Sequence, residues 1–412
     1  MISFEQAMRE IRQHAQQLAT ERVPLAEMCG RVLAEDVISS INLPGFDNSA
    51  MDGFALGAAH LQLPEGAVIP VQRLQLAGNA VFSLGEKVCQ IMTGAAVPHG
   101  AVTVLPVEDV ELIGSFESSD GFSIRLKQNL VAQQNIRLAG EDVQSGELLC
   151  AAGAELNTSH VMLFAALGID AVTVRKRIKA AVFCTGEELL IDNAVDLRSG
   201  QIRNSNGPYI LAELHALGVD VVHYVVIPDQ QDAYLQAVQA AEKNGCHLIV
   251  STGAVSMGVR DFVPSALAAL NATIIFHKVR MRPAKPSLFA VLPSGALVFG
   301  LPGNPMSCAV GLRFFVQEAI SGLQGLQSER AIVAVLQTPI TKKIGWQLMQ
   351  KARLSISAHG QAQVSLLPGQ ESFRIKPFVR ANVWVQLPEV AEHLTEGELV
   401  YCYPIHSPGL VL

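Results

Sequence analysis

The feature that most constrains the fold is an alternation of short apolar runs with helical patterns between residues 177 and 327. Runs such as IKAAVFC, VDVVHYVVI and CHLIVST are separated by segments such as NGPYILAELHALG and QDAYLQAVQAAEKNG. Strands that read as continuous apolar runs are buried on both faces, and their alternation with helices is typical of a parallel sheet covered on both sides. We therefore predict a doubly wound, parallel-sheet α/β domain over residues 177–327.

The remaining segments have other patterns. Residues 45–140 and 328–412 contain short β-type runs punctuated by Gly and Pro, which predict a β-rich domain and a small C-terminal barrel or sandwich. Of these two forms we expect a C-terminal β-barrel. Residues 1–44 and 141–176 mix helical and extended patterns, and MISFEQAMREIRQHAQQLATERV predicts an amphipathic helix at the start. We expect these two stretches to form a mixed α/β linker domain. The predicted fold class is a multidomain α/β chain, as its 412 residues suggest.

Composition and charge exclude several kinds of partner. The net charge of −7 argues against a nucleic acid bound through its phosphates. No apolar run reaches the ~18 residues of a membrane helix, and the first segment lacks the apolar core of a signal peptide. The seven cysteines are far apart, without a C-x-x-C pair, as is typical of reduced cytoplasmic thiols rather than a zinc site. We expect a cytoplasmic protein in which Cys184 and Cys246 are buried.

Four loops follow apolar runs of the α/β segment and carry polar groups. They are TGEELL, STGAVSMGVRDF, RMRPAKPS and LPGNPMS. In open α/β sheets, ligands bind beyond the carboxyl ends of the strands. The residues of these loops that we select as candidates are Glu187, Glu188, Gly253, Ser256, Gly258, Asp261, Arg282, Lys285, Pro302, Asn304, Pro305 and Ser307.

The chemistry of these loops predicts an anionic ligand with a divalent cation. Backbone N–H groups at such turns favour anions, as do Arg282 and Lys285. The carboxylates Glu187, Glu188 and Asp261 fit this setting if Mg²⁺ bridges them to phosphate oxygens. We infer a phosphate-bearing ligand with Mg²⁺. Each loop alone could be a plain turn, and Glu187 and Glu188 could be a solvated edge.

Outside this domain, the stretch LPGFDNSAMDGFAL is unusually polar for so apolar a chain. A plain turn needs one or two small polar residues, whereas this loop has Asp47, Asn48, Ser49 and Asp52. It is suited to holding a ligand. The alternatives are that Asp47 makes only an Asx turn and that Asp52 serves only the turn before Gly53.

Eight motifs in order give the chain a resemblance to the MoeA family of molybdopterin molybdenumtransferases, which includes the E domain of gephyrin and its plant counterpart. The motifs cover nearly the whole length, and 373–389 looks like a diverged last motif. They are FDNSAMDGFA (46–55), IMTGAAVP (91–98), GED (140–142), TGEEL (185–189), IRNSN (202–206), STGAVSMGVRDF (251–262), RPAKP (282–286) and GLPGNPMS (300–307).

The resemblance implies an enzyme that inserts molybdenum from molybdate into adenylylated molybdopterin with release of AMP, in a Mg²⁺-dependent step. It implies a four-domain homodimer whose site lies between the molybdopterin-binding α/β domain of one subunit and the β-rich domain of the other. The molybdopterin adenylyltransferase is a further candidate partner.

The resemblance also assigns roles to residues. Those that it places among the catalytic groups are Asp52, Thr93, Asp142, Glu188, Asp229 and Asp261, of which Asp229 could instead be a helix N-cap. Those that it places at the substrate or molybdate are Asn48, Ser49, Gly253, Ser256, Gly258, Arg282, Lys285, Pro302, Asn304, Pro305 and Ser307. The metal set that we expect is Glu187, Glu188 and Asp261.

The sequence departs from the family pattern at four positions. Glu187 replaces Asp, Ala254 and Ala284 replace Gly, and Arg282 replaces Lys. An Ala at a positive φ costs about 1 kcal/mol or more, and a guanidinium is not equivalent to an ammonium. These changes motivate one alternative, a catalytically weakened scaffold or cofactor chaperone of the same fold. Another alternative is an enzyme acting on a different nucleotide-linked substrate.

Overall fold

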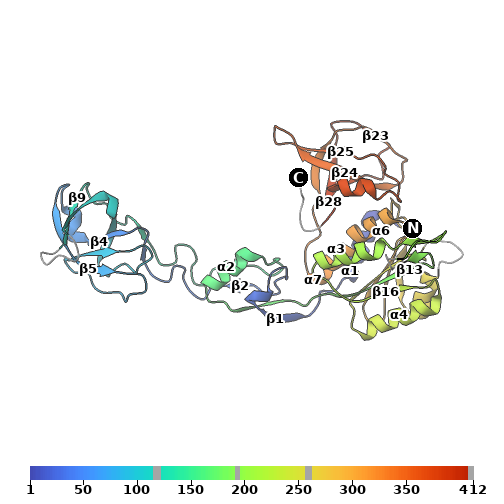
Figure 1. Cartoon of the computed structure of the whole chain (residues 1–412), viewed down its shortest axis with the longest axis horizontal. Coiled ribbons are helices and arrows are strands. Elements are labelled where there is room, and N and C mark those ends of the chain that lie inside the picture. Colours follow the sequence, from blue (N-terminus) through green and yellow to red (C-terminus); the bar gives the residue numbers. More distant parts are fainter. Residues whose placement is uncertain (115–121, 191–194, 256–261, 407–412) are drawn as a thin grey trace.

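The computed structural model describes residues 1–114, 122–190, 195–255 and 262–406. The molecule is elongated (Figure 1), with a β-rich unit at one end, a small mixed unit in the middle, and the α/β and C-terminal units together at the other end. Within the described ranges, no helix is both long and apolar enough to span a bilayer.

A six-stranded sheet forms the centre of the α/β unit, and β16, β13, β17 and β21 are parallel, as predicted. The exception is β20, which is antiparallel to both β21 and β18. A loop of five residues joins β20 to β21, too short for a parallel crossover. Because β18 is antiparallel to β20, and β20 is antiparallel to β21, β18 runs in the same direction as the four parallel strands. In spatial order, the strands are β16 (Asp220–Ile227), β13 (Lys179–Thr185), β17 (Leu248–Thr252), β21 (Leu297–Leu301), β20 (Leu288–Val291) and β18 (Thr273–His277).

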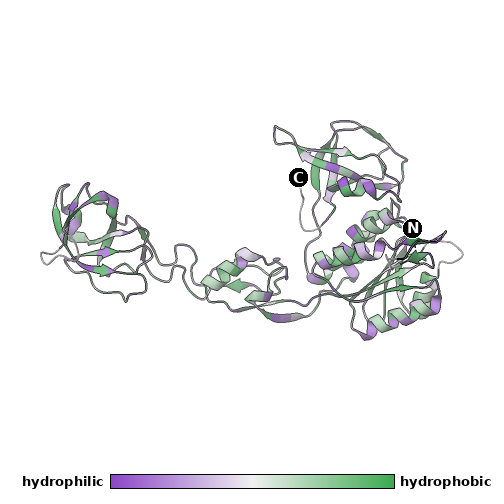
Figure 2. Ribbon diagram, viewed as in Figure 1, coloured by the Kyte–Doolittle hydropathy of each residue, from purple (hydrophilic) through white to green (hydrophobic). Residues whose placement is uncertain are grey.

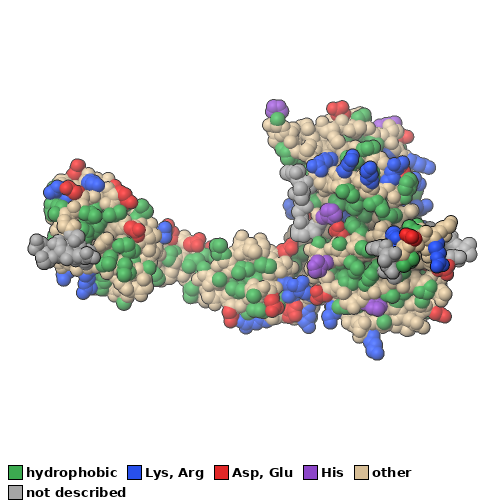
Figure 3. Space-filling model, viewed as in Figure 1, with side chains coloured by type: hydrophobic (Ala, Val, Ile, Leu, Met, Phe, Trp, Pro, Cys, Tyr) green, Lys and Arg blue, Asp and Glu red, His purple; other side chains and the backbone are tan. Residues whose placement is uncertain are grey.

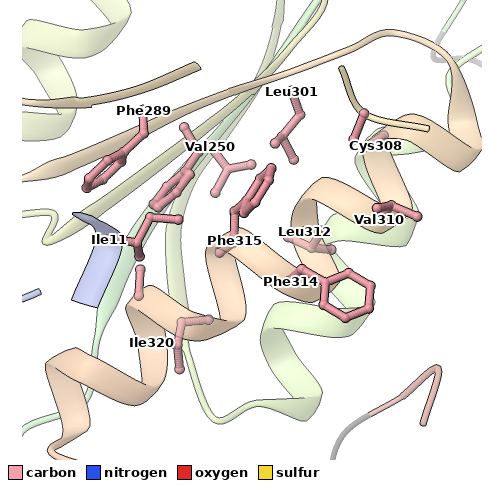
Figure 4. Close-up of a cluster of buried hydrophobic side chains, with 14 of the residues drawn as sticks. Ile11, Val250, Phe289, Leu301, Cys308, Val310, Leu312, Phe314, Phe315 and Ile320 are labelled. Carbon is pink, nitrogen blue, oxygen red and sulfur yellow. The ribbon is translucent and has the colours of Figure 1, made fainter. Parts of the chain in front are cut away.

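Helices cover both faces of this sheet, because successive strand residues point to opposite sides. In β13, Val182 packs into one apolar cluster, and Ala181 and Phe183 pack into the other. Figure 4 shows the first cluster, in which Val250 and Phe289 of the sheet meet helical side chains. Figure 2 shows the hydrophobic residues along the strands. The elements around the sheet are α3 (Asn206–Ala216), α4 (Gln231–Lys243), α5 (Val263–Ala269), α6 (Pro305–Gly311), η4 (Leu312–Val316), α7 (Gln317–Gln324) and the short pair β14 (Leu189–Leu190) and β15 (Ile202–Arg203).

The first helix, α1 (Phe4–His14), packs against the α/β unit. The Ser3 side chain caps it by accepting a hydrogen bond from the backbone N–H of Gln6. Its buried residues, Phe4, Ala7 and Ile11, lie in the same cluster as those of η4 and α7. The sequence-based division placed this helix in the linker domain, and that placement is wrong, because the apolar face of the helix is buried elsewhere.

The β-rich unit is built on a six-stranded sheet with an apolar cluster on each side. Gly, Pro and short 3₁₀ turns separate its strands. In spatial order, the strands are β7 (Ala101–Pro106), β4 (Gly53–Gly57), β6 (Val88–Ile91), β5 (Val68–Gln75), β9 (Phe122–Leu126) and β8 (Val110–Gly114), with η2 (Ala58–Gln62) and η3 (Val107–Asp109) between them.

The mixed unit is a small body around its own apolar cluster. The chain leaves the α/β unit along β1 (Thr20–Pro24) and returns along β12 (Ala171–Arg175), its antiparallel partner. The other elements are η1 (Leu25–Glu27), β2 (Val37–Ile38), β11 (Leu148–Cys150) and α2 (Thr158–Ala166). Between this unit and the β-rich unit, β3 (Asn48–Ser49) pairs with β10 (Ile136–Arg137).

The C-terminal unit is the predicted β-barrel. The order β24-β25-β22-β28-β26 closes on itself, because β24 also pairs with β26. A short strand of the preceding unit, β19 (Met281–Arg282), adds to β24 and attaches the barrel to the α/β unit. The barrel elements are β22 (Ile332–Leu336), β23 (Ile340–Thr341), β24 (Gln347–Ile356), β25 (Ala362–Leu366), η5 (Lys376–Arg380), β26 (Val383–Leu387), β27 (His393–Leu394) and β28 (Leu399–Pro404).

Candidate functional site

The loops after three neighbouring strands converge at the carboxyl edge of the α/β sheet. The hydroxyl of Thr185, at the end of β13, donates a hydrogen bond to the carbonyl of Thr252 at 3.1 Å. The N–H of Gly253, after β17, donates to the carbonyl of Leu301, at the end of β21, at 3.0 Å. The structure therefore brings together the loops that the sequence predicted to meet.

Gly253 has no room for a side chain. Its φ is +90°, and a Cβ there would lie 2.4 Å from Oγ1 and 2.7 Å from the carbonyl oxygen of Thr185. The next residue, Ala254, has a φ of +52°, and Ala284 has a φ of +72°. Both alanines that depart from the family pattern therefore adopt the left-handed conformation, and the strain predicted for them is present.

The LPGNP loop leads directly into a helix beneath the site. Asn304 occupies the N-cap position of α6, and Pro305 is in its first turn. The side-chain amide of Asn206, at the start of α3, donates to the carbonyl of Gly303 at 2.7 Å. This contact ties the loop to a residue of the IRNSN motif that we had not selected as a site residue. Pro302 connects β21 to this loop.

The RPAKP loop borders a groove of about 420 Å³, which we call the RPAKP groove. Arg282 and Lys285 are exposed at its edge, and Ser307 of α6 also lines it. All the described residues that line the groove are neutral or cationic, which favours an anion. The C-terminal barrel contributes lining residues that the sequence reasoning missed, namely Leu348, Met349, Gln350, Gln370 and Ser372.

Trp346 was also missed. The guanidinium carbon of Arg282 lies 4.4 Å from the centroid of the indole, and the ammonium nitrogen of Lys285 lies 5.4 Å from it. Trp346 lies more than sixty positions after both cations in the sequence, and it follows an ordinary turn at Gly345. No local pattern indicates that it reaches the RPAKP loop.

The carboxylates expected to bind a metal follow β13. Glu187 and Glu188 form an exposed turn, and the Glu188 carboxylate folds back to within 2.9 Å of where a Gly186 Cβ would lie. The third expected ligand, Asp261, lies outside the described residues, as do Ser256 and Gly258. Within the described ranges, no three His, Cys, Asp or Glu side chains form a potential metal cluster, so this metal set stays a prediction.

Asp229 follows β16 at the same edge of the sheet. It is half-buried, and the N-cap position of α4 is occupied by Gln230, whose side chain makes no capping hydrogen bond. The structure thus assigns the N-cap position to Gln230 rather than to Asp229, and a catalytic role for Asp229 stays a prediction.

Asp52 and Thr93 form a hydrogen-bonded pair in the β-rich unit. Asp52 Oδ1 accepts from the Thr93 backbone N–H at 2.7 Å and from its hydroxyl at 2.8 Å. These two hydrogen bonds, the backbone one first, lower the pKa of the carboxyl, so Asp52 is ionised at neutral pH. A turn role alone would not require the partner loop of Thr93.

The neighbouring polar residues make local contacts. The buried Ser49 hydroxyl donates to the Met51 carbonyl at 2.6 Å, and the Asn48 amide donates to the Phe46 carbonyl at 3.3 Å. Asp47 Oδ1 accepts from the Ala139 N–H at 2.8 Å. These contacts shape the loop, and a substrate contact for Asn48 or Ser49 stays a prediction.

Asp142 is exposed on a second groove, of about 400 Å³, that Arg137 and Glu141 also line. Asp52 and Thr93 belong to the β-rich unit, and Asp142 follows β10 next to it, whereas Arg282 and Lys285 belong to the α/β unit at the opposite end of the elongated molecule (Figure 1). Within one chain, the structure does not bring these two groups of candidates together.

The fold and the groove at the carboxyl edge define a protein with a molybdopterin-binding α/β domain. A family model described as a probable molybdopterin binding domain matches residues 181–322. Models described as the MoeA N-terminal region (domains I and II) and the MoeA C-terminal region (domain IV) match residues 2–168 and 333–405. The chain belongs to the MoeA family of molybdopterin molybdenumtransferases.

Similar proteins extend over almost the whole chain. A molybdopterin molybdenumtransferase of Synechococcus elongatus is 35% identical, covering 92% of this chain and 93% of the relative. One of Haemophilus influenzae is 33% identical, with 94% of each covered. A crystal structure of a molybdopterin biosynthesis MoeA protein of Pyrococcus horikoshii superposes with a TM-score of 0.81 at 26% identity, covering 99% of this chain and 100% of the other.

Proposed function

We propose that this protein inserts molybdenum from molybdate into adenylylated molybdopterin and releases AMP, as a Mg²⁺-dependent step of molybdenum cofactor biosynthesis in the cytoplasm. The observation that carries the proposal is the RPAKP groove, where two exposed cations lie beside the carboxyl edge of a molybdopterin-binding fold. Molybdate is a tetrahedral dianion, and the phosphates of the pterin are also anionic, so both need cations and N–H donors at short range.

In this proposal, each loop has a separate task. Arg282 and Lys285 hold the oxyanion by charge and hydrogen bonding, with the Ser307 hydroxyl beside them. The Gly253 turn, which has no room for a side chain, lets the backbone approach the phosphates of the pterin. Glu187, Glu188 and Asp261 would hold Mg²⁺, since carboxylate oxygens suit this ion, which would neutralise charge on the pyrophosphate.

The separation of the candidates within one chain supports a homodimer. Asp52, Thr93 and Asp142 lie in or next to the β-rich unit, which is at the opposite end of the molecule from the α/β unit that carries the RPAKP loop (Figure 1). A second copy could supply them, as a two-fold assembly makes each contact twice. The ionised Asp52 would then face the groove from the partner chain.

The direct test is AMP release by the purified protein with adenylylated molybdopterin, molybdate and Mg²⁺. We expect turnover by the unaltered protein and a loss of at least about tenfold for Lys285→Ala, because one of two groove cations is removed. Lys343→Ala, at an exposed lysine that does not line the groove, is the matched control. Absence of molybdate-dependent AMP release would contradict the proposal.

The positive φ of Ala254 and Ala284 favours one alternative, a scaffold that binds the pterin with weakened turnover. It predicts binding of adenylylated molybdopterin without formation of AMP. Complementation of a cell that lacks its own molybdenum insertase separates the two functions in vivo: restored molybdoenzyme activity requires turnover. If the purified protein bound no molybdopterin at all, another nucleotide-linked substrate would be indicated. Binding of a molybdopterin adenylyltransferase is a further prediction, checked by co-purification.

A further inference from the structure

A single indole ring contacts both cations of the RPAKP loop. Arg282 lies 4.4 Å and Lys285 5.4 Å from the centroid of the half-buried Trp346, both within the range of cation–π attraction. In the part of the chain that the structure describes, neither cation forms a salt bridge, although other basic residues such as Arg280 do. The indole is thus their common partner.

The backbone fixes the indole relative to the loop. Trp346 directly precedes β24, whose first residues pair in parallel with β19: Met281 opposite Gln347, and Arg282 opposite Leu348. The Gln347 N–H also donates to the Arg280 carbonyl at 3.1 Å. Since Trp346 belongs to the barrel and Arg282 to the α/β unit, this pairing makes the position of the cations depend on the attachment of the barrel. Figure 3 shows basic side chains gathered on the visible face of the barrel unit.

Two like charges held close together repel each other, and long side chains lose rotamer entropy when they are fixed. The negative face of an aromatic ring offsets both effects by attracting each cation. Trp346 does not itself line the groove, so it would not touch a ligand there. Its effect would be to keep two positive charges together at the edge of the groove before a ligand arrives.

We propose that Trp346 is a positioning residue that makes the RPAKP groove selective for doubly charged tetrahedral oxyanions. A paired double charge matches a dianion, whereas a singly charged anion gains less from the second cation. The inference rests on the proposed function in taking molybdate as the natural ligand, but it concerns binding of the oxyanion alone.

Calorimetric titration of the full-length protein with sodium molybdate, without pterin, tests the proposal. For Trp346→Leu, which keeps apolar bulk and lacks a π face, we expect the dissociation constant for molybdate to rise about tenfold, equivalent to ~1.4 kcal/mol. The dissociation constant of Trp346→Phe should lie between those of the unaltered protein and Trp346→Leu, because phenyl is a weaker cation–π partner than indole. For perchlorate, a tetrahedral monoanion, Trp346→Leu should reduce the affinity less than it does for molybdate. Equal losses for both anions would overturn the selectivity, and unchanged molybdate affinity would overturn the whole proposal.

A double-mutant cycle distinguishes a positioning role of Trp346 from a purely structural role. If Trp346 acts through the cations, Trp346→Leu should have little further effect on molybdate affinity when Arg282 and Lys285 are both Ala. The same loss in both backgrounds would contradict positioning.

Intrinsic fluorescence gives a second readout, because the chain has only two tryptophans and Trp384 is buried. A change in emission on adding molybdate should be present in the unaltered protein and absent in Trp346→Phe. An identical change in both would place the signal at Trp384 and contradict the contact.

The outcome is distinguishable from that of the AMP-release assay. If Trp346→Leu weakened molybdate binding while the unaltered protein formed no AMP, the inference would stand and the proposed function would fail. If the unaltered protein released AMP normally while Trp346→Leu kept its full affinity for molybdate, the proposed function would stand and the inference would fail.

Discussion

At the scale of single residues, two alanines show how the same backbone conformation has different consequences. Ala254 and Ala284 both have positive φ, but Ala254 is half-buried at the edge of a cluster, whereas Ala284 is 1% exposed within the core. Replacement by Gly relieves the left-handed strain in both cases and loosens the unfolded chain in both. Only at Ala284 does it also remove a fully buried methyl group.

We therefore expect Ala254→Gly to raise the free energy of unfolding by about 0.5–1 kcal/mol, because the relief of strain exceeds the gain in unfolded-chain entropy. Ala284→Gly should be nearly neutral, because loss of the methyl costs about 0.8 kcal/mol. Urea unfolding of the two variants checks this. The reverse order of stabilities would contradict it.

At the scale of elements, the sequence predicted what depends on local pattern. The apolar runs located β13, β17 and β21, and their direction brought Gly253 and the LPGNP loop to one edge. The reversal of β20 and the packing of α1 were not predictable, because strand direction and the partner of an amphipathic face depend on residues distant in sequence. For the same reason, the sequence did not predict that two barrel residues reach this region, Trp346 against the cations of the RPAKP loop and Gln370 on the wall of the groove. Asn206, in contrast, lay in a motif that was recognised.

The packing of α1 predicts which part of the molecule is destabilised when the buried face of this helix is altered. Ile11 is fully buried against the α/β unit, so Ile11→Ala should cost about 2–5 kcal/mol and speed amide exchange in β17 and β21. Leu156→Ala, in the cluster of the mixed unit, is the matched control and should leave those amides unchanged. Faster exchange in β12 than in β17 for Ile11→Ala would restore the original assignment of this helix to the linker domain.

At the scale of the whole molecule, the barrel and the α/β unit are joined by a pH-sensitive contact. His406 Nδ1, after β28, lies 2.5 Å from Glu213 Oε1 on α3, and this hydrogen bond raises the pKa of the imidazole. A raised pKa stabilises the fold below the ordinary histidine pKa, and the stabilisation is lost as pH rises through the folded value.

We accordingly expect His406→Gln to lower stability at pH 5.5 and to have little effect at pH 8.5. Because the imidazole is largely exposed, screening keeps the effect below about 1 kcal/mol. Thermal unfolding at the two pH values measures it, with exposed His359→Gln as the control. An effect that grew with pH would have the wrong sign for this contact.

The proposed homodimer predicts rescue between two inactive variants. Asp52→Asn alters the β-rich unit and Lys285→Ala the α/β unit, which lie at opposite ends of the molecule (Figure 1), so a mixed dimer should keep one complete site. Co-expression in equal amounts should restore about a quarter of the sites, because about half of the dimers are mixed. Mixing the separately purified variants without exchange of subunits should restore none. No recovery on co-expression would indicate that each site is built from one chain.

The pairing of β1, along which the chain leaves the α/β unit, with β12, along which it returns, has a consequence for shortening the chain. Thr20 pairs with Arg175, and the Lys176 N–H donates to the Ala19 carbonyl, so the chain re-enters beside the point where it left. Residues 20–175 therefore leave the α/β unit and return to it at nearly the same point. A linker of two or three residues that joins 19 to 176 should give a truncated protein that folds and still binds molybdate. That minimal version should form no AMP, and adding the excised arm on a second, full-length copy with its own groove disabled should bring turnover back.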